Sequence, residues 1–382
     1  MSGRRTFLGN AAATVVVTKF SSLRSFGFAM EGPETIDATM SDREKAGLRG
    51  PVEQCFEETI TPPGPDYPES RFSSTIKYDR VGRILRFNSI LTTGVKLTGS
   101  YTYDSQGHLQ KTISDQPSGP PIETDYTYDE KGRLIGITGS GEESSVFQYD
   151  DQGRKTRIVR SELKPSPSDT DHRPSGMISI ENDDLYWPPP GGGYVKTLFN
   201  ERDQPTETQI YGAKGRLTGR MLRRYDAEGR TVESNLVIEN VIESIVPAED
   251  LEQLMADHEA LKELKKAMQF CSKMQPRNSY IFDAEGRVAE KHVRFGAYPE
   301  MITKITYNDH GDKMEEHTTM FGDMNHALSE EESESSSQES YSRYSYQYDS
   351  FGNWTEQKIS YGSGTNGLFK TSAVRHQTIT YY

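Results

Sequence analysis

The chain has 382 residues, of which 33% are hydrophobic, and a formal net charge of −13 at pH 7. Its mean hydropathy of −0.76 is low for this length, which disfavours a large compact core and favours one elongated repeat domain with much of its sheet in water. The acidic balance, together with the lack of a basic stripe with interleaved aromatic residues, argues against nucleic-acid binding.

Residues 1–29 are predicted to be an export signal. Arg4 and Arg5 are followed by a Phe-Leu pair and a mildly apolar stretch, which is typical of a twin-arginine signal. A small-x-small sequence that ends at Ala29 predicts cleavage after that residue, and the protein is then periplasmic or extracellular. The alternative is a disordered basic tail. No segment reaches the roughly 20 apolar residues that a transmembrane helix needs.

Residues 30–47 are expected to form a flexible lead-in with one helical turn at 41–46, and residues 48–382 to form the folded domain. The segment 47–59 has the composition of a first strand, and the segment 374–382 that of a last strand.

Between these segments the phrase Tyr-Asp-x-x-Gly-Arg recurs. Its lead aromatics Tyr78, Tyr103 and Tyr128 are 25 residues apart, as are Phe282 and Tyr307, which indicates an array of one repeated supersecondary unit. The positions predicted to build the repeated turns are Tyr78, Asp79, Gly82, Tyr103, Asp104, Gly107, Tyr128, Asp129, Gly132, Tyr149, Asp150, Gly153, Tyr225, Asp226, Gly229, Phe282, Asp283, Gly286, Tyr348, Asp349 and Gly352. Two worn copies begin at Phe199 and Tyr307.

Each repeat has the pattern of a β-hairpin. A carboxylate at the first turn position accepts hydrogen bonds from the turn backbone, and glycine at the fourth position tolerates a positive φ. The flanking residues alternate as strands do, and a second turn at 93–96 or 212–215 divides a repeat into two strands. The pattern predicts an all-β fold, an array of antiparallel hairpins that form a curved or spiralling sheet.

With nine copies in near-constant register, the chain resembles the YD-repeat, or RHS-like, family of bacterial proteins from about Tyr78 to Tyr382. The resemblance implies antiparallel strands in a curved or spiralling sheet, which in large toxin-associated members closes into a shell around a cargo. Those members end in a core motif and a variable toxic domain. Neither is found here, so the resemblance is to a short exported member without a toxin domain.

Three insertions interrupt the period. Residues 164–193 are rich in proline and glycine and are predicted to be a long loop. Residues 247–271 have leucines at helical spacing, early acids and late lysines, which predicts the one inserted α-helix. Residues 329–340 are a run of glutamate and serine, predicted to be a disordered acidic loop.

Cys55 and Cys271 are the only cysteines. They are either two free thiols or one disulfide, and a disulfide requires Cα atoms within about 7 Å in an oxidising compartment. Nothing in their spacing indicates a zinc site or a redox pair.

A search for chemistry finds one dense group of metal-ligand types, namely Asp309, His310, Asp312, Glu315 and His317. Because part of the group occupies a repeat turn and no two members have the helical i, i+4 spacing, we expect no metal site. No nucleophile elbow, phosphate-binding loop or dinucleotide fingerprint is present, so no catalytic residue and no cofactor is predicted.

The sequence therefore favours a non-enzymatic exported scaffold that binds a glycan or another protein at the cell envelope. One alternative is a hydrolase or lyase acting on polysaccharide, which would need two carboxyl groups within about 5–10 Å in one groove. A second alternative is a small shell or immunity-type partner of a toxin.

Overall fold

The computed structural model describes residues 40–64, 68–115, 119–139, 144–160, 193–212, 215–239, 262, 276–295, 300–321, 337–363 and 368–382. Nearly all of these residues that adopt regular structure are in β-strands, accompanied by the short helix α2 (Asp42–Lys45). The chain divides into two compact units, and each is considered separately below.

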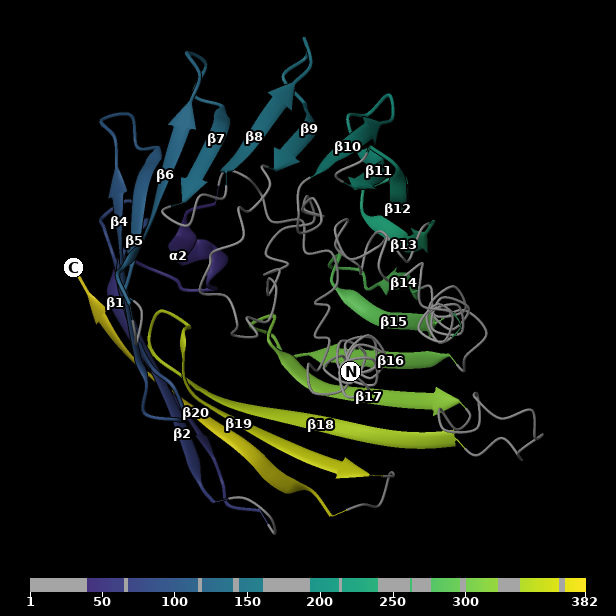
Figure 1. The fold of residues 1–382 in the computed structure, drawn as a ribbon. Helices are drawn as coiled ribbons and strands as arrows, with labels where there is room; N and C mark the ends of the chain where they lie inside the picture. Colours follow the sequence, from purple (N-terminus) through teal and green to yellow (C-terminus); the bar gives the residue numbers. More distant parts are fainter. Residues whose placement is uncertain are drawn as a thin grey trace, which may run out of the picture. The chain divides into compact units, whose positions relative to one another are not determined.

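Unit 2 contains the strands nearest the two ends of the chain (Figure 1). Its strands are β1 (Val52–Thr61), β2 (Ser70–Tyr78), β3 (Ile84–Ile90), β4 (Lys96–Tyr103), β5 (Leu109–Ser114), β6 (Ile122–Tyr128), β7 (Leu134–Gly139), β16 (Met301–Tyr307), β17 (Lys313–Phe321), β18 (Ser337–Tyr348), β19 (Trp354–Ser363) and β20 (Lys370–Tyr381). They pair antiparallel in the order β16-β17-β18-β19-β20-β1-β2-β3-β4-β5-β6-β7. The last strand of the chain therefore lies beside the first.

Unit 1 is built from the middle of the chain. Its strands are β8 (Ser144–Tyr149), β9 (Lys155–Arg160), β10 (Gly193–Phe199), β11 (Pro205–Gly212), β12 (Leu217–Tyr225), β13 (Thr231–Ile238), β14 (Pro276–Phe282) and β15 (Val288–Phe295). They pair antiparallel in chain order from β8 to β15. The predicted all-β array of antiparallel hairpins is confirmed in both units.

Each repeat turn follows the strand that ends in the lead aromatic. The register shifts by one residue at that aromatic, as at Tyr78, which pairs with Ile84 across the β2–β3 turn. Such a shift beside a glycine of positive φ is a bulge that increases the local twist of the hairpin.

The buried apolar cluster of unit 2 lies where the ends of the described chain meet. Leu48, Val52, Cys55 and Tyr78 form it, with Ile379 among the partly buried residues around it. Cys55 is a free thiol, and burial raises its pKa to about 12, so it packs as a small protonated hydrophobe. Cys271 lies outside the described residues.

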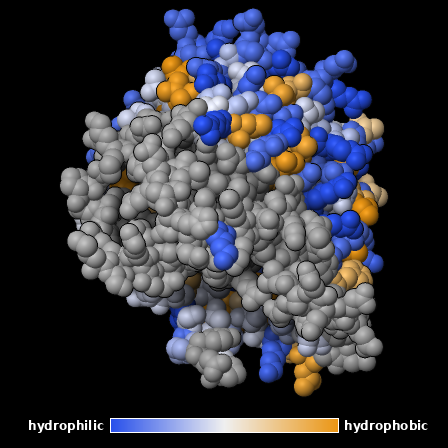
Figure 2. All heavy atoms as spheres, turned by 45° about the vertical axis from the view of Figure 1, so that its right-hand side comes forward, coloured by the Kyte–Doolittle hydropathy of each residue, from blue (hydrophilic) through white to orange (hydrophobic). Residues whose placement is uncertain are grey.

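Elsewhere the described surface is largely polar. Among the coloured residues of the face shown in Figure 2, hydrophilic ones predominate and hydrophobic ones form small separate groups. This agrees with the low mean hydropathy of the chain. Within the described ranges, no helix has the length and apolar character needed to cross a bilayer.

Two sequence predictions need correction. The last four residues of the predicted acidic loop, 337–340, are the first residues of β18 and pair with β17 from Phe321 to Thr318. Backbone pairing with a neighbouring strand does not require apolar side chains, so composition alone misjudged this segment. The lead-in is not flexible throughout, since the helical turn expected at 41–46 is present as α2, which the Ser41 side chain caps in a capping box with Glu44.

Other predicted segments fall largely outside the description. The leader 1–29 and the loop 164–193 are not described, apart from Gly193 at the start of β10. Within the predicted helix 247–271 only Lys262 is described, and its backbone is helical.

Candidate functional site

The repeated turn is held by its aspartate. In the copy that follows β6, Asp129 Oδ1 accepts hydrogen bonds from the backbone amides of Lys131 and Arg133, each at 2.9 Å. Oδ2 accepts one from Nε of Arg133 at 2.7 Å. Six other aspartates accept the same bond from the amide four residues ahead: Asp79, Asp104, Asp150, Asp226, Asp283 and Asp349.

These bonds stabilise the ionised carboxylate. The pKa of Asp129 lies below its ordinary value because the amide and then the guanidinium of Arg133 donate to it, and these outweigh the opposing effect of burial. A group whose pKa is depressed in the folded state contributes stability that is present above its unfolded pKa and is lost as the pH falls through the folded one. The motif aspartates therefore support the fold at neutral pH as charged acceptors.

The glycine of the motif has the conformation that the turn requires. Gly132 has a φ of 74°, and the glycines at the same place in the other full copies also have positive φ. A Cβ on Gly132 would lie 2.9 Å from Nε2 of His108, a side chain of the preceding turn.

Gly132→Val is therefore expected to be costly, with strain on the order of 1–3 kcal/mol, because a β-branched residue is disfavoured at positive φ. Lys131→Val, one position earlier, is the matched control and should cost much less. Urea unfolding gives the size of the loss, and hydrogen exchange gives its place. Equal losses in the two variants, or a loss spread evenly along the chain, would contradict a repeat of independent hairpins.

The last residue of the motif also reaches the next repeat. The Arg83 guanidinium carbon lies 4.5 Å from the ring centroid of Tyr103, whose hydroxyl donates to the carbonyl of Ile84 at 2.8 Å. In the next copy the ring of His108 stacks on that of Tyr128 at 4.7 Å between centroids. In unit 1, Arg154 lies over Phe199 and Arg230 over Phe282. The motif cation thus binds its own aspartate and covers the aromatic ring of the next copy.

In unit 2 the segment 41–51 lies across several turns. Arg49 donates its amide to Oδ1 of Asn353 at 2.6 Å, and Nδ2 of Asn353 donates to the Arg49 carbonyl at 2.9 Å. The Arg49 guanidinium donates to the carbonyls of His310 and Gly352, in two different turns. Oδ2 of Asp42 accepts from the amide of Ile84 in a third turn, at 3.0 Å.

The histidine and acid group at 309–317 serves packing. His310 stacks on Tyr348 at 4.0 Å between ring centroids, and His317 stacks on Tyr341 at 4.2 Å. Oδ2 of Asp312 accepts from the hydroxyl of Tyr348 at 2.7 Å. In the part of the chain that the structure describes, no group of three or more histidine, cysteine or acidic side chains is placed to hold a metal.

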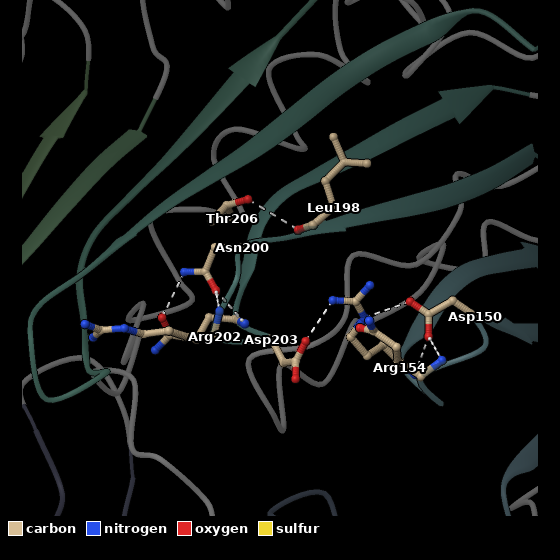
Figure 3. Close-up of polar contacts among 9 residues, drawn as sticks. Asp150, Arg154, Leu198, Asn200, Arg202, Asp203 and Thr206 are labelled. Atoms are coloured by element: carbon tan, nitrogen blue, oxygen red, sulfur yellow. Dashed lines mark hydrogen bonds and ion pairs between the residues drawn. The ribbon is translucent and has the colours of Figure 1, made fainter.

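Of the two worn copies, the one between β10 and β11, here called the departing turn, is shown in Figure 3. Asn200 and Gln204 stand where other copies have an aspartate and its cation, and Nδ2 of Asn200 donates to Oε1 of Gln204 at 3.0 Å. Asp203 replaces the glycine and keeps a φ of 60°, the one positive φ of a non-glycine residue in the described ranges. Its carboxylate accepts from Nη1 of Arg154 at 2.8 Å, which joins this turn to the previous one.

Two open cavities lie on the sheets. One in unit 2, of about 420 Å³, is lined by residues of β16 to β19 that include Glu315, Arg343 and Lys358. One in unit 1, of about 500 Å³, lies at the departing turn, and Arg202, Arg223 and Arg224 are among its lining residues. Each cavity has a single carboxylate in its lining, Glu315 in the first and Asp226 in the second.

Sequence reasoning identified the turn residues but missed two features. It paired each motif arginine with its own aspartate and did not foresee the stacking on the next repeat, although the recurrence of an aromatic 20 residues after Arg83 was visible. It also missed the contacts of Arg49, because their partners are more than 250 residues away in sequence.

The chain is similar in part to one protein family and to several solved structures. Residues 68–165 match the family model Teneurin YD-shell. No curated protein matches the chain. Among solved structures, TcdB2-TccC3-TEV is similar at 11% identity over 82% of this chain and 15% of that chain, with a TM-score of 0.36. A porin-like protein from Bacteroides uniformis ATCC 8492 is similar at 9% identity over 87% of this chain and 99% of that chain, with a TM-score of 0.33.

The present chain spans about 15% of the length of the TcdB2-TccC3-TEV chain. The recurring Tyr-Asp-x-x-Gly-Arg turns form antiparallel hairpins of the YD/RHS-repeat type, and over residues 68–165 the chain is similar to the Teneurin YD-shell family.

Proposed function

We propose that this protein is an exported, non-enzymatic scaffold that binds a glycan or a protein at the cell envelope. The observation that carries the proposal is the engagement of the motif side chains. Asp129 and Arg133 bond each other, and Tyr128 donates its hydroxyl to the carbonyl of Leu109 at 2.9 Å. Motif side chains that hold turns and join repeats have a structural role. The residues between the motifs are then available to bind a ligand.

The alternative of a polysaccharide hydrolase or lyase calls for two carboxyl groups that face one groove and belong to no turn. Neither of the two cavities described above has this arrangement, since Glu315 is alone in one and Asp226, a turn residue, is alone in the other. These linings favour binding over hydrolysis. The further alternative, a partner of a toxin encoded nearby, is decided by the neighbouring genes.

A screen of the purified chain 30–382 tests the binding proposal. A glycan array and a pull-down from envelope extract should give at least one saturable ligand. That ligand should be recovered chemically unchanged after prolonged incubation. Recovery of a cleaved saccharide would contradict the binding scaffold and favour the hydrolase or lyase.

Export is part of the proposal, with residues 1–29 as the signal and cleavage after Ala29. Arg4→Lys combined with Arg5→Lys should keep the full-length chain in the cytoplasm, because twin-arginine signals depend on the arginine pair. Fractionation and immunoblotting measure this, with Lys19→Arg as a control that leaves the pair intact. Undiminished accumulation of the double variant outside the cytoplasm would contradict the assignment of residues 1–29 as a twin-arginine signal.

A further inference from the structure

The departing turn between β10 and β11 has a cation at its third residue, where the next two turns of unit 1 have an acid. In the next two turns of unit 1 the third residue is an acid, Glu228 or Glu285, and each accepts from the arginine of its own turn, at 3.3 and 3.1 Å. In the departing turn the third residue is Arg202. Its guanidinium reaches across and donates to the carbonyl of Ala227 at 3.1 Å.

In the same turn an uncharged amide, Asn200, replaces the motif aspartate, and the acids that remain are Glu201 and Asp203. Oδ1 of Asn200 accepts from the amides of Arg202 and Gln204 at 2.9 and 3.0 Å, so the amide reproduces the hydrogen bonds of the usual aspartate without its charge. The new acid, Asp203, is bonded to Arg154 and belongs to the previous turn. Among the described residues, no carboxylate lies within ion-pair distance of Arg202.

This cation lines the cavity of about 500 Å³, together with Arg223 and Arg224. Arg223 is 9% exposed and donates from Nη1 to Oγ1 of Thr208 at 3.1 Å. Arg224 pairs with Glu233 at 2.9 Å. The one carboxylate of the lining, Asp226, is bonded to Arg230 at 2.7 Å. Arg223 and Arg224 are consecutive in β12, so their side chains point to opposite faces of the sheet, and Arg202 is the cation on which the site depends.

We propose that this cavity binds an oxyanion, a phosphate or sulfate group, with Arg202 as its principal contact. A guanidinium presents planar, parallel N–H donors that match two oxygens of such a group, and a charge-assisted bond of this kind is stronger than a neutral one. The replacement of aspartate by Asn200 keeps the turn in place while it removes the repulsion that an anion would meet. The inference rests on the proposed binding function insofar as the oxyanion is part of a larger ligand.

The experiment is calorimetric titration of the purified chain 30–382 with inorganic phosphate and with sulfate, at low and at physiological salt. Arg202→Gln should weaken binding about tenfold or more, the scale of losing one charged hydrogen bond. Asn200→Asp should weaken it in the same direction, because it restores the charge of the other turns; it keeps the acceptor of the two backbone bonds and loses the bond to Gln204. The matched control is Arg80→Gln, an exposed turn arginine of unit 2 that does not line this cavity.

A second arm distinguishes the sources of the anion. A sulfated oligosaccharide and its desulfated counterpart are titrated against the same variants. Preference for the sulfated form, lost in Arg202→Gln, assigns the site to an anionic glycan, whereas binding of the inorganic ions alone assigns it to a free anion.

Failure to bind any of these anions, or binding that all three variants weaken equally, overturns the proposal. A chain that binds a neutral glycan but no oxyanion retains its proposed function and loses this site. The two failures are therefore distinguishable.

Discussion

Tyr78→Ala is expected to destabilise the protein by about 3–5 kcal/mol, the usual cost of truncating a large buried aromatic residue. Tyr78 is 1% exposed and packs with Leu48, Val52 and Cys55, which come from the segment before β1 and from β1 itself. Its backbone carbonyl also accepts from the hydroxyl of Tyr382. A cavity at this point would loosen the place where the first and last strands of the chain meet.

Urea unfolding measures the loss of stability in Tyr78→Ala, and two further variants serve as controls. Tyr361→Ala removes the same side chain at a position that is 52% exposed and should cost much less. Tyr78→Phe keeps the buried ring and should retain most of the stability lost in Tyr78→Ala. A loss in Tyr78→Ala no larger than that in Tyr361→Ala would mean that this cluster is not a core.

Asn353→Leu is expected to cost about 1–3 kcal/mol, because it leaves the backbone N–H and carbonyl of Arg49 without this partner and removes one of the bonds of the Tyr381 hydroxyl. The amide of Asn353, which is 3% exposed, bonds both the N–H and the carbonyl of Arg49 and donates to the hydroxyl of Tyr381 at 2.8 Å. Leucine has the same number and branching of side-chain heavy atoms, is bulkier, and can serve none of these groups. The segment 41–51 should then detach from the turns, which hydrogen exchange of its amides reports.

Asn88→Leu is the matched control. Asn88 lies in β3, and its buried Oδ1 has no hydrogen-bond partner. Its loss should therefore be nearly neutral, since no bond is broken. If Asn353→Leu were as mild as Asn88→Leu, the bonds between Arg49 and Asn353 would contribute little to the fold.

The hairpin array was predictable because its chemistry is local. An aspartate, a glycine three residues later and the amides between them form one turn, so the segment Asp129–Arg133 fixes its own geometry without help from distant residues. Repetition at a constant period then predicts the strands on both sides of each turn.

Features that depend on distant partners were not predictable. The pairing of β20 with β1 and the contacts of Arg49 join residues about 300 positions apart, and no local pattern announces them. The prediction of a disordered loop was wrong at residues 337–340 for a related reason. The neighbouring strand β17 supplies their hydrogen bonds, which composition cannot reveal.

The sequence shows which residues of the candidate site depart from the motif, but not the contacts that they make. Asn200 and Asp203 were recognisable as departures from the motif, and the turn they form keeps the expected place in the array. The sequence did not show that Asp203 bonds Arg154 of the previous turn, nor that Arg202 turns toward Ala227. These directions depend on how adjacent hairpins pack.

The most direct test of the central claim, that the repeated motif is a structural device, is residue-resolved hydrogen exchange of the turn amides. The third residues of the turns lie on the exposed surface, and unbonded amides there would exchange rapidly. In Val81, Gln106, Lys131, Gln152, Glu285 and Phe351 the amide instead donates to the motif aspartate. The account predicts clear protection of all six amides, and loss of that protection at Lys131 alone in Asp129→Ala. Rapid exchange of these amides in the native protein would contradict it.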